Sequence, residues 1–312
     1  MPGPLQIIGF GALSIDDIVY VDRPLTAGKG RVIDRLTDHG GNVATALVAA
    51  ATLGGGGAGF IGWLRDITPE DIAASELASH GVDISFAPRR PDARAIRSAI
   101  TVGSDGERFI AYDDVVPHGT DDTLPDAVLA QAKVLLIDGY ATHSPGVVAR
   151  ARRLGLAIVA DIEWSLGAAT ETLLSLSDHL VLPYAFGQSQ TGADDPSAIL
   201  RALWAPGRAA VILTRGEHGS YVRQAGDSTL WHLPAHRVQA VDTTGAGDCF
   251  HGAYAYALAQ GQSALDSAVF ANAAAAISVS GHGGRKALPG LAACQARLAG
   301  AGAPRPTSFG VL

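Results

Sequence analysis

The feature that most constrains the fold of this chain is a series of short, β-rich apolar runs separated by alanine-rich stretches. Runs of consecutive apolar residues are typical of strands that are buried on both faces of a parallel sheet. Strands that alternate with helices predict an α/β sandwich with right-handed crossovers. The expected strands are 6–11, 134–138, 157–161, 180–182 and 209–214, and the expected helices are 42–53, 69–80, 145–154, 196–204, 248–260 and 265–280, with helices only after Asp242.

Two parts of the sequence interrupt this alternation. Residues 15–21 and 31–36 are strand-like without a helix between them, and residues 97–102 and 107–112 flank a turn that contains Asp105-Gly106. An Asp-Gly pair between alternating runs indicates a hairpin. We therefore predict a single domain over 1–312, with a small antiparallel sheet inserted at about 15–36 and 97–113.

An inserted sheet of this kind covers a site as a lid or makes a dimer contact. Its exposed edges favour pairing across a twofold axis, so we expect a homodimer formed through the lid. The segment 300–312 is rich in glycine and proline and is expected to be loose.

Composition excludes several classes of protein. The net charge of −7, from 23 basic and 30 acidic residues, argues against a nucleic-acid binder. No apolar stretch reaches 18 residues, and the N-terminus lacks a basic start and a cleavage pattern, so neither a membrane span nor a secretory signal is expected. Cys249 and Cys294 have no metal-ligand spacing, and two thiols in a chain of this length predict a reduced, cytoplasmic protein.

The most informative motif is VDTTGAGDCFHG at 241–252. Gly245, Ala246 and Gly247 carry no bulky side chain, so backbone N–H groups at a helix start can approach an anion there. A carboxylate at Asp248 would repel that anion unless it has another task, and a general base for a substrate hydroxyl suits it. An N-cap aspartate on a glycine-rich turn would give the same local pattern.

DTTGAGD resembles the second signature of the PfkB, or ribokinase-like, sugar kinases. Their first signature, a Gly-Gly motif near the N-terminus, has its counterpart in GGNVATA at 40–46, and the resemblance covers roughly residues 5–295. It implies a ribokinase-like three-layer sandwich with a mostly parallel central sheet and a small inserted β-sheet lid. It also implies that the chain phosphorylates a sugar with ATP.

The resemblance assigns roles at matching positions. Asp248 corresponds to the catalytic base, and Gly245, Ala246 and Gly247 correspond to the anion hole for the transferred phosphoryl group. Asp16 falls where the family binds sugar hydroxyls, with Asp17 as the position most easily confused with it. The other implied substrate contacts are Gly41, Asn42 and Thr45, where many members have asparagine in place of Thr45.

For the nucleotide, LTRGEHG at 213–219 matches the loop that follows a strand beside ATP, which implicates Thr214, Gly216 and Gly219. Asn272 matches a position near the adenine, although a polar residue on a helix face is an equally good interpretation. ATP is expected with Mg²⁺. The segment 278–284 resembles a loop that helps to hold a monovalent cation such as K⁺.

The chain departs from the family in one segment. The Asn-Glu-x-Glu sequence that many members use for Mg²⁺ and phosphate would occupy 183–186, which reads Pro-Tyr-Ala-Phe. Either metal handling is altered, or other groups such as Asp161 and Glu163 contribute through water, so metal ligands stay unassigned. A catalytically weak sugar- or nucleotide-binding regulator also stays an alternative.

The substrate is the least determined part of the sequence interpretation. Gly283-Gly284-Arg285 and Phe250-His251-Gly252 resemble a branch that includes sulfofructose kinase, and a lysine at the place of Lys29 can meet an anionic substituent there. The arginine expected near Tyr140 for a sulfonate is absent. We therefore expect transfer of the γ-phosphoryl group to a hydroxymethyl hydroxyl of a small sugar or sugar-like alcohol.

A nucleoside kinase of the same family is the nearest alternative, because Tyr20, Phe109 and Tyr112 on the lid offer aromatic platforms. A dinucleotide dehydrogenase is disfavoured, since Phe10-Gly11 is only a fragment of GxGxxG.

Overall fold

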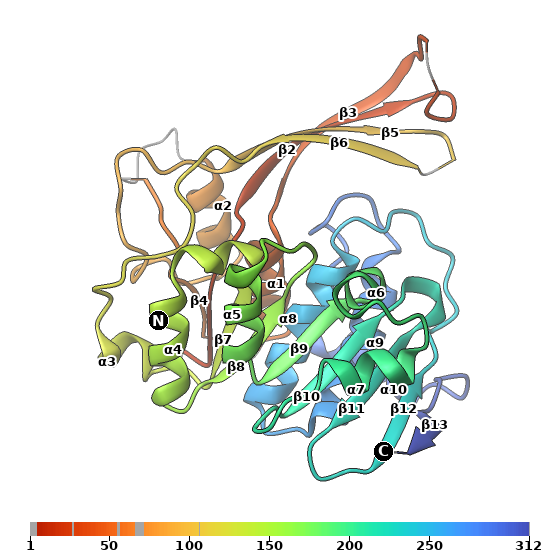
Figure 1. Cartoon of the computed structure of the whole chain (residues 1–312). Helices are drawn as coiled ribbons and strands as arrows, with labels where there is room; N and C mark the ends of the chain where they lie inside the picture. The colour runs from red at the N-terminus through yellow and green to blue at the C-terminus, as the bar shows by residue number, and fades with distance from the viewer. Residues whose placement is uncertain (1–4, 27, 55–56, 66–71, 106, 312) are drawn as a thin grey trace.

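A computed structural model describes residues 5–26, 28–54, 57–65, 72–105 and 107–311. Its central element is a nine-stranded sheet in the order β13-β12-β11-β10-β9-β8-β7-β1-β4 (Figure 1). The pairs from β4 to β10 are parallel, and the pairs from β10 to β13 are antiparallel. The strands are β1 Ile7–Phe10, β4 Ala58–Phe60, β7 Val134–Asp138, β8 Ala157–Asp161, β9 His179–Pro183, β10 Ala210–Thr214, β11 Ser220–Gln224, β12 Thr229–Leu233 and β13 Thr307–Val311.

Helices cover both faces of this sheet, so the molecule has three layers (Figure 1). Alternate strand residues point to opposite faces. Ile7 therefore packs into one apolar cluster with α1, α8 and α9, and Ile8 into a second cluster on the other face with α4 and α7. The α-helices are α1 Asn42–Thr52, α2 Ile72–Ser79, α3 Asp126–Leu129, α4 Pro145–Arg153, α5 Ala168–Leu176, α6 Tyr184–Thr191, α7 Pro196–Ala202, α8 Ala246–Ala259, α9 Ala264–Ser278 and α10 Leu291–Ala299. The predicted α/β class and ribokinase-like layering are confirmed.

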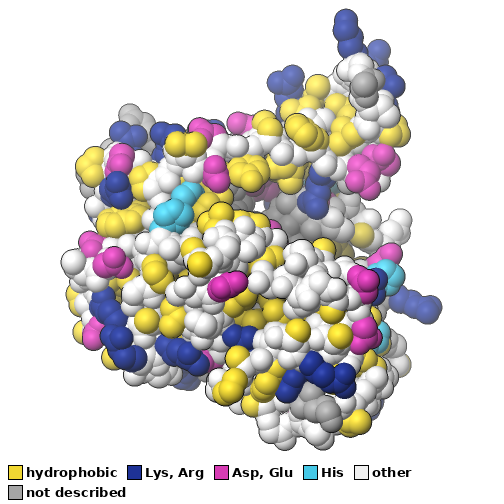
Figure 2. All heavy atoms as spheres, in the orientation of Figure 1, with side chains coloured by type: hydrophobic (Ala, Val, Ile, Leu, Met, Phe, Trp, Pro, Cys, Tyr) yellow, Lys and Arg dark blue, Asp and Glu magenta, His cyan; other side chains and the backbone are white. Residues whose placement is uncertain are grey.

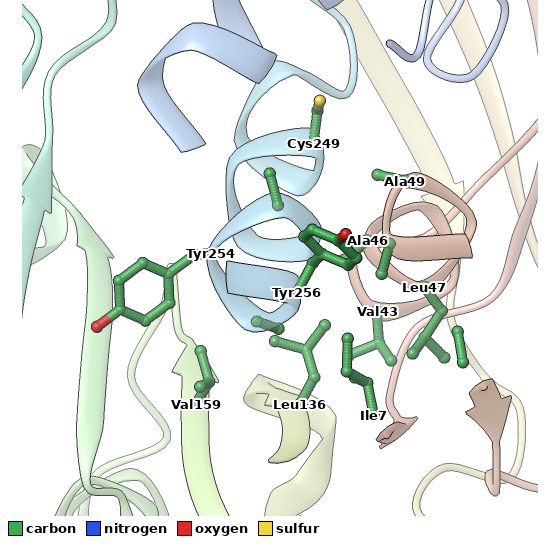
Figure 3. Close-up of a cluster of buried hydrophobic side chains, with 14 of the residues drawn as sticks. Ile7, Val43, Ala46, Leu47, Ala49, Leu136, Val159, Cys249, Tyr254 and Tyr256 are labelled. Carbon is green, nitrogen blue, oxygen red and sulfur yellow. The ribbon is translucent and has the colours of Figure 1, made fainter. Parts of the chain in front are cut away.

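Helices α1 and α8 pack unusually closely against each other. Figure 3 shows Val43, Ala46 and Leu47 of α1 facing Tyr256 of α8. Gly252 makes this approach possible, because a Cβ atom there would lie 2.1 Å from the carbonyl oxygen of Ala46. This packing fixes the two helices whose N-terminal ends carry both sequence signatures.

We expect Gly252→Val to lower the free energy of unfolding by about 3 kcal/mol, because the added atoms would force α1 and α8 apart. Thermal and urea unfolding followed by circular dichroism measures the effect. Gly302→Ala is the matched control, since a Cβ there meets no atom within 4 Å. Equal stability of the two variants would contradict the close-packing argument.

The lid sheet consists of β2 Ser14–Val21, β3 Val32–Gly40, β5 Ile96–Val102 and β6 Arg108–Asp113, in the order β3-β2-β5-β6. It projects from the three-layer body, and Lys and Arg side chains gather near its far tip (Figures 1 and 2). The outer pairs are antiparallel as expected, but the central pair, β2 and β5, is parallel. The reason is that the chain passes back through β4 and α2 of the body before it enters β5.

The C-terminal prediction was wrong in part. Residues 307–311 form β13, which pairs antiparallel with β12 and places Phe309 against the ring of Tyr221. An edge strand with unpaired backbone groups accepts a further strand readily, which explains why this glycine- and proline-rich segment is ordered. The part of the predicted helix 69–80 that precedes Ile72 lies outside the described residues. None of the helices in the described ranges combines the length and the apolar character needed to cross a bilayer.

Candidate active site

The candidate site lies at the carboxyl ends of the parallel strands, where open α/β sheets bind their ligands. Asp138 and Asp161 end β7 and β8 side by side, and Thr214 ends β10 farther along the same edge. The lid strand β2, the start of α1 and the start of α8 meet there in a pocket. Its lining comprises Asp16, Ile18, Asp38, His39, Gly40, Gly41, Thr45, Thr244, Gly245, Asp248 and Gly284.

The lid side of the pocket carries two neighbouring carboxylates. Asp16 on β2 lies directly across from Asp38 on β3, and both belong to the inward-facing residues of the lid sheet. Burial raises the pKa of Asp16, while hydrogen bonds from Ser98 and Ser14 oppose that rise. Gly40 packs directly against this carboxylate, because a Cβ atom there would lie 2.2 Å from Asp16 Oδ2 and would displace the side chain.

Asp17 has a different environment from Asp16. Because side chains alternate along a strand, Asp17 points away from the pocket. It accepts a 2.9 Å hydrogen bond from Thr37 Oγ1 and lies 3.7 Å from the Arg97 guanidinium on the exposed face. Of the two adjacent acids, only Asp16 lines the pocket.

Gly41 lines the pocket, and Asn42, which is not among the lining residues, follows it as the first residue of α1. Gly41 has φ 91°, and a Cβ atom there would lie 2.4 Å from the carbonyl oxygen of Ala12, so the turn requires glycine. Asn42 Nδ2 donates a 3.1 Å hydrogen bond to Asp161 Oδ2, which fixes the orientation of the amide. Thr45 Oγ1 accepts a 3.1 Å hydrogen bond from the buried Arg285.

The opposite wall of the pocket is the N-terminus of α8. The helix begins at Ala246, after Gly245 in the left-handed region at φ 71°. A Cβ atom on Gly245 would lie 2.7 Å from the Gly284 carbonyl oxygen, whereas one on Gly247 would meet no atom within 4 Å. The backbone at Gly247 is thus open to an approaching group, and the helix dipole favours an anion there.

Asp248 lies in the first turn of α8 rather than at its N-cap, and no side chain makes a capping hydrogen bond at this helix start. The capping interpretation of Asp248 therefore fails. Burial, and after it the carboxylates of Asp161 and Glu163, raise the pKa of Asp248 well above the usual range for aspartate. His251 and Arg285 act in the opposite direction. A partly buried carboxylate with a raised pKa has the properties expected of a general base.

Two lid side chains contact the loop that precedes α8. Arg108 Nη1 donates a 2.7 Å hydrogen bond to Thr244 Oγ1, and Tyr20 Oη lies 3.5 Å from Asp242 Oδ2. Burial alone would raise the pKa of Asp242, but hydrogen bonds from Gly283 N and Thr244 outweigh burial and lower this pKa. The lid thus contacts both signatures, because Asp16 on β2 lies beside Gly40 of the first and Arg108 on β6 bonds to Thr244 of the second.

The residues predicted for the nucleotide lie farther along the sheet edge. Thr214 ends β10, and its hydroxyl donates a 3.4 Å hydrogen bond to the Leu182 carbonyl. Gly216 and Gly219 bound a short 3₁₀ turn, and a Cβ atom on Gly219 would lie 1.9 Å from the carbonyl oxygen of Leu233. Asn272 Nδ2 donates a 2.8 Å hydrogen bond to the Pro234 carbonyl, which fixes this amide beside the loop after β12.

Lys29 does not join this group. It lies in the turn at the far end of the β2–β3 hairpin, where its carbonyl oxygen accepts a 2.8 Å hydrogen bond from Arg23. It is not among the residues that line the pocket with Asp16 and Asp248.

Pro183 ends β9 and caps α6, and residues 184–186 form the first turn of α6. The Tyr184 hydroxyl donates to the Asp194 carbonyl, and the Arg215 guanidinium lies 4.4 Å from the centre of the Tyr184 ring. An aromatic ring with a stacked cation thus stands where many family members have acids. Among the described residues, no cluster of three or more His, Cys, Asp or Glu side chains could hold a metal ion.

Several site residues were missed by the sequence interpretation. Asp38 stands two residues before the Gly-Gly pair, which was a positional signal. Asp161 was considered only for Mg²⁺ handling through water, and its hydrogen bond from the Asn42 amide was not foreseen. Arg285 is buried and donates to Glu76, Gly40 O and Thr45, and only the structure reveals this role.

Comparison with known proteins agrees with this geometry. Residues 5–290 match the family model described as pfkB family carbohydrate kinase. A putative ribokinase from Agrobacterium tumefaciens has 25% identity and a TM-score of 0.84, with 94% of this chain and 97% of that chain covered. Fructokinase-1 from Zea mays is 28% identical over 91% of this chain and 94% of its own length.

The bifunctional protein HldE from Azotobacter vinelandii is 27% identical over 79% of this chain, but the match spans just over half of that protein, 53%. The family match covers nearly the whole chain and includes both signatures. The chain therefore belongs to the pfkB family of carbohydrate kinases.

Proposed function

We propose that this protein is an ATP-dependent kinase that transfers the γ-phosphoryl group to a hydroxymethyl hydroxyl of a small sugar or sugar-like alcohol. The observation that carries this proposal is a single pocket with Asp16 on its lid wall, Asp248 on its α8 wall and the glycine loop beside Asp248. The polar lining, with carboxylates on both walls, suits a ligand that carries several hydroxyl groups.

The proposed step follows from the placement of these groups. Asp16, Asp38 and the Asn42 amide would hold the sugar hydroxyls. As the hydroxymethyl oxygen forms its bond to the γ-phosphorus, the bond to the leaving ADP oxygen breaks and the hydroxyl proton moves to Asp248. Backbone N–H groups at Gly245, Ala246 and Gly247 would stabilise the charge on the transferred group. The lid limits the access of water, which would otherwise compete.

The nucleotide would lie along the edge from α8 toward β10, with its phosphates at the α8 N-terminus and with Thr214, Gly216, Gly219 and Asn272 beside it. Mg²⁺ keeps several waters and binds largely through substrate phosphates, so a site without a cluster of acidic ligands fits it. When bound, Mg²⁺ neutralises phosphate charge. A monovalent cation such as K⁺ at the 278–284 loop stays a prediction, tested by activity with K⁺ against Na⁺.

Two observations favour a sugar over a nucleoside. Phe109, one of three candidate aromatic platforms, alternates with Arg108 and so faces away from the pocket, because Arg108 reaches inward to Thr244. Tyr20 is engaged with Asp242 and packs edge-on against His282. That leaves Tyr112, on the inward face of the lid, as the ring that could stack on a nucleobase.

We expect a pentose or a hexose to raise the melting temperature by several degrees. Ribose and fructose are the first sugars to test, because the chain resembles ribokinases and fructokinases. ADP release in the presence of the same sugars and ATP then measures turnover. Stabilisation by nucleosides alone would overturn the sugar proposal. Sugar binding without any ADP release would instead support the alternative of a catalytically weak regulator.

We also propose that the protein is a homodimer formed through the lid. Phe109 and Ile33 are exposed large apolar side chains on lid strands, with exposed fractions of 66% and 63%. Sedimentation velocity is expected to show a dimer that Phe109→Glu dissociates, because a buried unpaired charge would oppose association. Leu166→Glu, at an exposed position on the body, is the matched control. A monomeric wild type would refute the proposal.

A further inference from the structure

His251 has an unusual hydrogen-bonding environment. It lies on α8 one turn after Asp248 and is buried. Its Nδ1 is 2.8 Å from the Gly247 carbonyl oxygen, and its Nε2 is 2.8 Å from the Val181 carbonyl oxygen. A neutral imidazole has one N–H and one lone pair, so either neutral tautomer would direct a lone pair at a carbonyl oxygen. Both contacts are hydrogen bonds only when both nitrogens carry a proton.

A carboxylate accompanies this ring. Asp161 Oδ2 lies 3.5 Å from His251 Nδ1, and each side chain is only 3% exposed. Burial, and after it the carboxylates of Glu163 and Asp138, raise the pKa of Asp161. Asp161 therefore needs a cation beside it to stay ionised in the folded protein.

The groups that face His251 come from three elements. Asp161 approaches from β8, the Val181 carbonyl from β9, and Asp248 is one turn earlier on the same helix. Asp161 in turn accepts the hydrogen bond from the Asn42 amide at the start of α1. A chain of contacts thus runs from His251 through Asp161 to Asn42 at the pocket.

We propose, on the basis of the kinase function proposed above, that His251 is a doubly protonated imidazolium that holds Asp161 ionised and thereby orients Asn42 toward the sugar. In this arrangement the Asn42 N–H is committed to Asp161, which leaves the amide oxygen to accept a hydrogen bond from a substrate hydroxyl. His251 is a positioning residue, since it acts through Asp161 rather than on the substrate.

A second buried histidine provides an internal contrast. His179 on β9 contacts the hydroxyl of Tyr254 through Nδ1 at 2.8 Å. A hydroxyl can donate to a neutral ring, and burial lowers the pKa of His179 to about 4. His179 is therefore neutral at pH 8. It lies on β9, the strand whose Val181 carbonyl contacts His251, and it packs against the same helix, α8.

The direct test is nuclear magnetic resonance of the full chain labelled with ¹⁵N-histidine. Two-bond ¹H–¹⁵N correlation spectra at pH 8 distinguish protonated from unprotonated ring nitrogens, and spectra of His251→Gln and His179→Gln assign the two residues. We expect both nitrogens of His251 to be protonated and one nitrogen of His179 to be unprotonated. An unprotonated nitrogen on His251 at pH 8 would overturn the proposal whether or not the protein proves to be a kinase. Should His251→Gln fail to fold, the His179→Gln and wild-type spectra still test the assignment through the nuclear Overhauser contacts of the ring with Phe250.

A double-mutant cycle tests the positioning role with the sugar that proves active. His251→Gln is expected to lower kcat/KM for the sugar about 10-fold while the KM for ATP changes less than about twofold. In an Asp161→Asn background the same substitution should cost less than about twofold, because the partner charge is gone. Equal losses in the two backgrounds would refute the coupling. Loss of stability without a change in kinetics would also refute it.

Discussion

Asp248→Asn is expected to lower kcat by about 10³-fold while ATP binding stays within about twofold of wild type. Positioned general bases contribute 10²- to 10⁴-fold, and the amide removes the base without changing the size of the side chain. ADP release in the presence of the sugar measures kcat, and isothermal titration with a non-hydrolysable ATP analogue measures binding. Near-normal turnover of this variant would refute the assignment of Asp248 as the base.

The matched control is Asp266→Asn. Asp266 occupies the same position in the first turn of α9 that Asp248 occupies in α8, but its exposed carboxylate accepts a hydrogen bond from Ser263 at its own helix start.

The wild-type rate should rise with pH as Asp248 loses its proton. Since the pKa of Asp248 is raised, that rise is expected at higher pH than an ordinary aspartate would give, and it should vanish in Asp248→Asn.

Asp16→Asn is expected to lower kcat/KM for the sugar about 100-fold, mainly through KM. Hydrogen bonds to a charged group contribute about 1.5–3 kcal/mol each, and an amide replaces one acceptor oxygen with a donor, which corresponds to roughly a 100-fold loss. Steady-state kinetics with varied sugar at saturating ATP measures the effect.

The neighbouring residue provides the control for this second prediction. Asp17→Asn makes the same chemical change one residue along β2, on the exposed face of the lid, where Asp17 meets Thr37 and Arg97. We expect kcat/KM to stay within about twofold of wild type. If the two variants lost activity equally, the assignment of Asp16 to the sugar would be wrong, and the lid as a whole would be the sensitive element.

The parallel core of the fold was predictable because its strands are fully buried. Val134–Asp138 and Ala157–Asp161 are apolar on both faces until their terminal acids, so sequence pattern and structure agree there to the residue. The strands β11 and β12 were not predicted, since their one-sided burial leaves polar residues between apolar ones. Strand β13 depends on the edge of β12, which local sequence does not reveal.

The candidate site was predictable only where glycine marked a close approach. Gly41 and Gly245 have backbone conformations that favour glycine, and the signatures around them led to Asp16 and Asp248. The roles of Asp38, Asp161 and His251 depend on pairs that are far apart in the sequence, such as Asn42 with Asp161, so a position beside a motif or at a strand end could not by itself reveal them. Lys29 was implicated by the resemblance to the sulfofructose kinase branch, but that resemblance did not show where the tip of the β2–β3 hairpin lies.

The contacts of Arg108 with Thr244 and of Tyr20 with Asp242 have a consequence for the energetics of the two substrates. The sheet that carries Asp16 is attached to the loop that leads into the phosphate end of α8. On the proposed function, we expect a sugar that draws this sheet inward to favour also the loop arrangement that a nucleotide would use. Because such coupling between sites is reciprocal, the factor by which the sugar tightens nucleotide binding equals the factor by which the nucleotide tightens sugar binding. The lid contacts would thus give the two affinities one shared coupling factor.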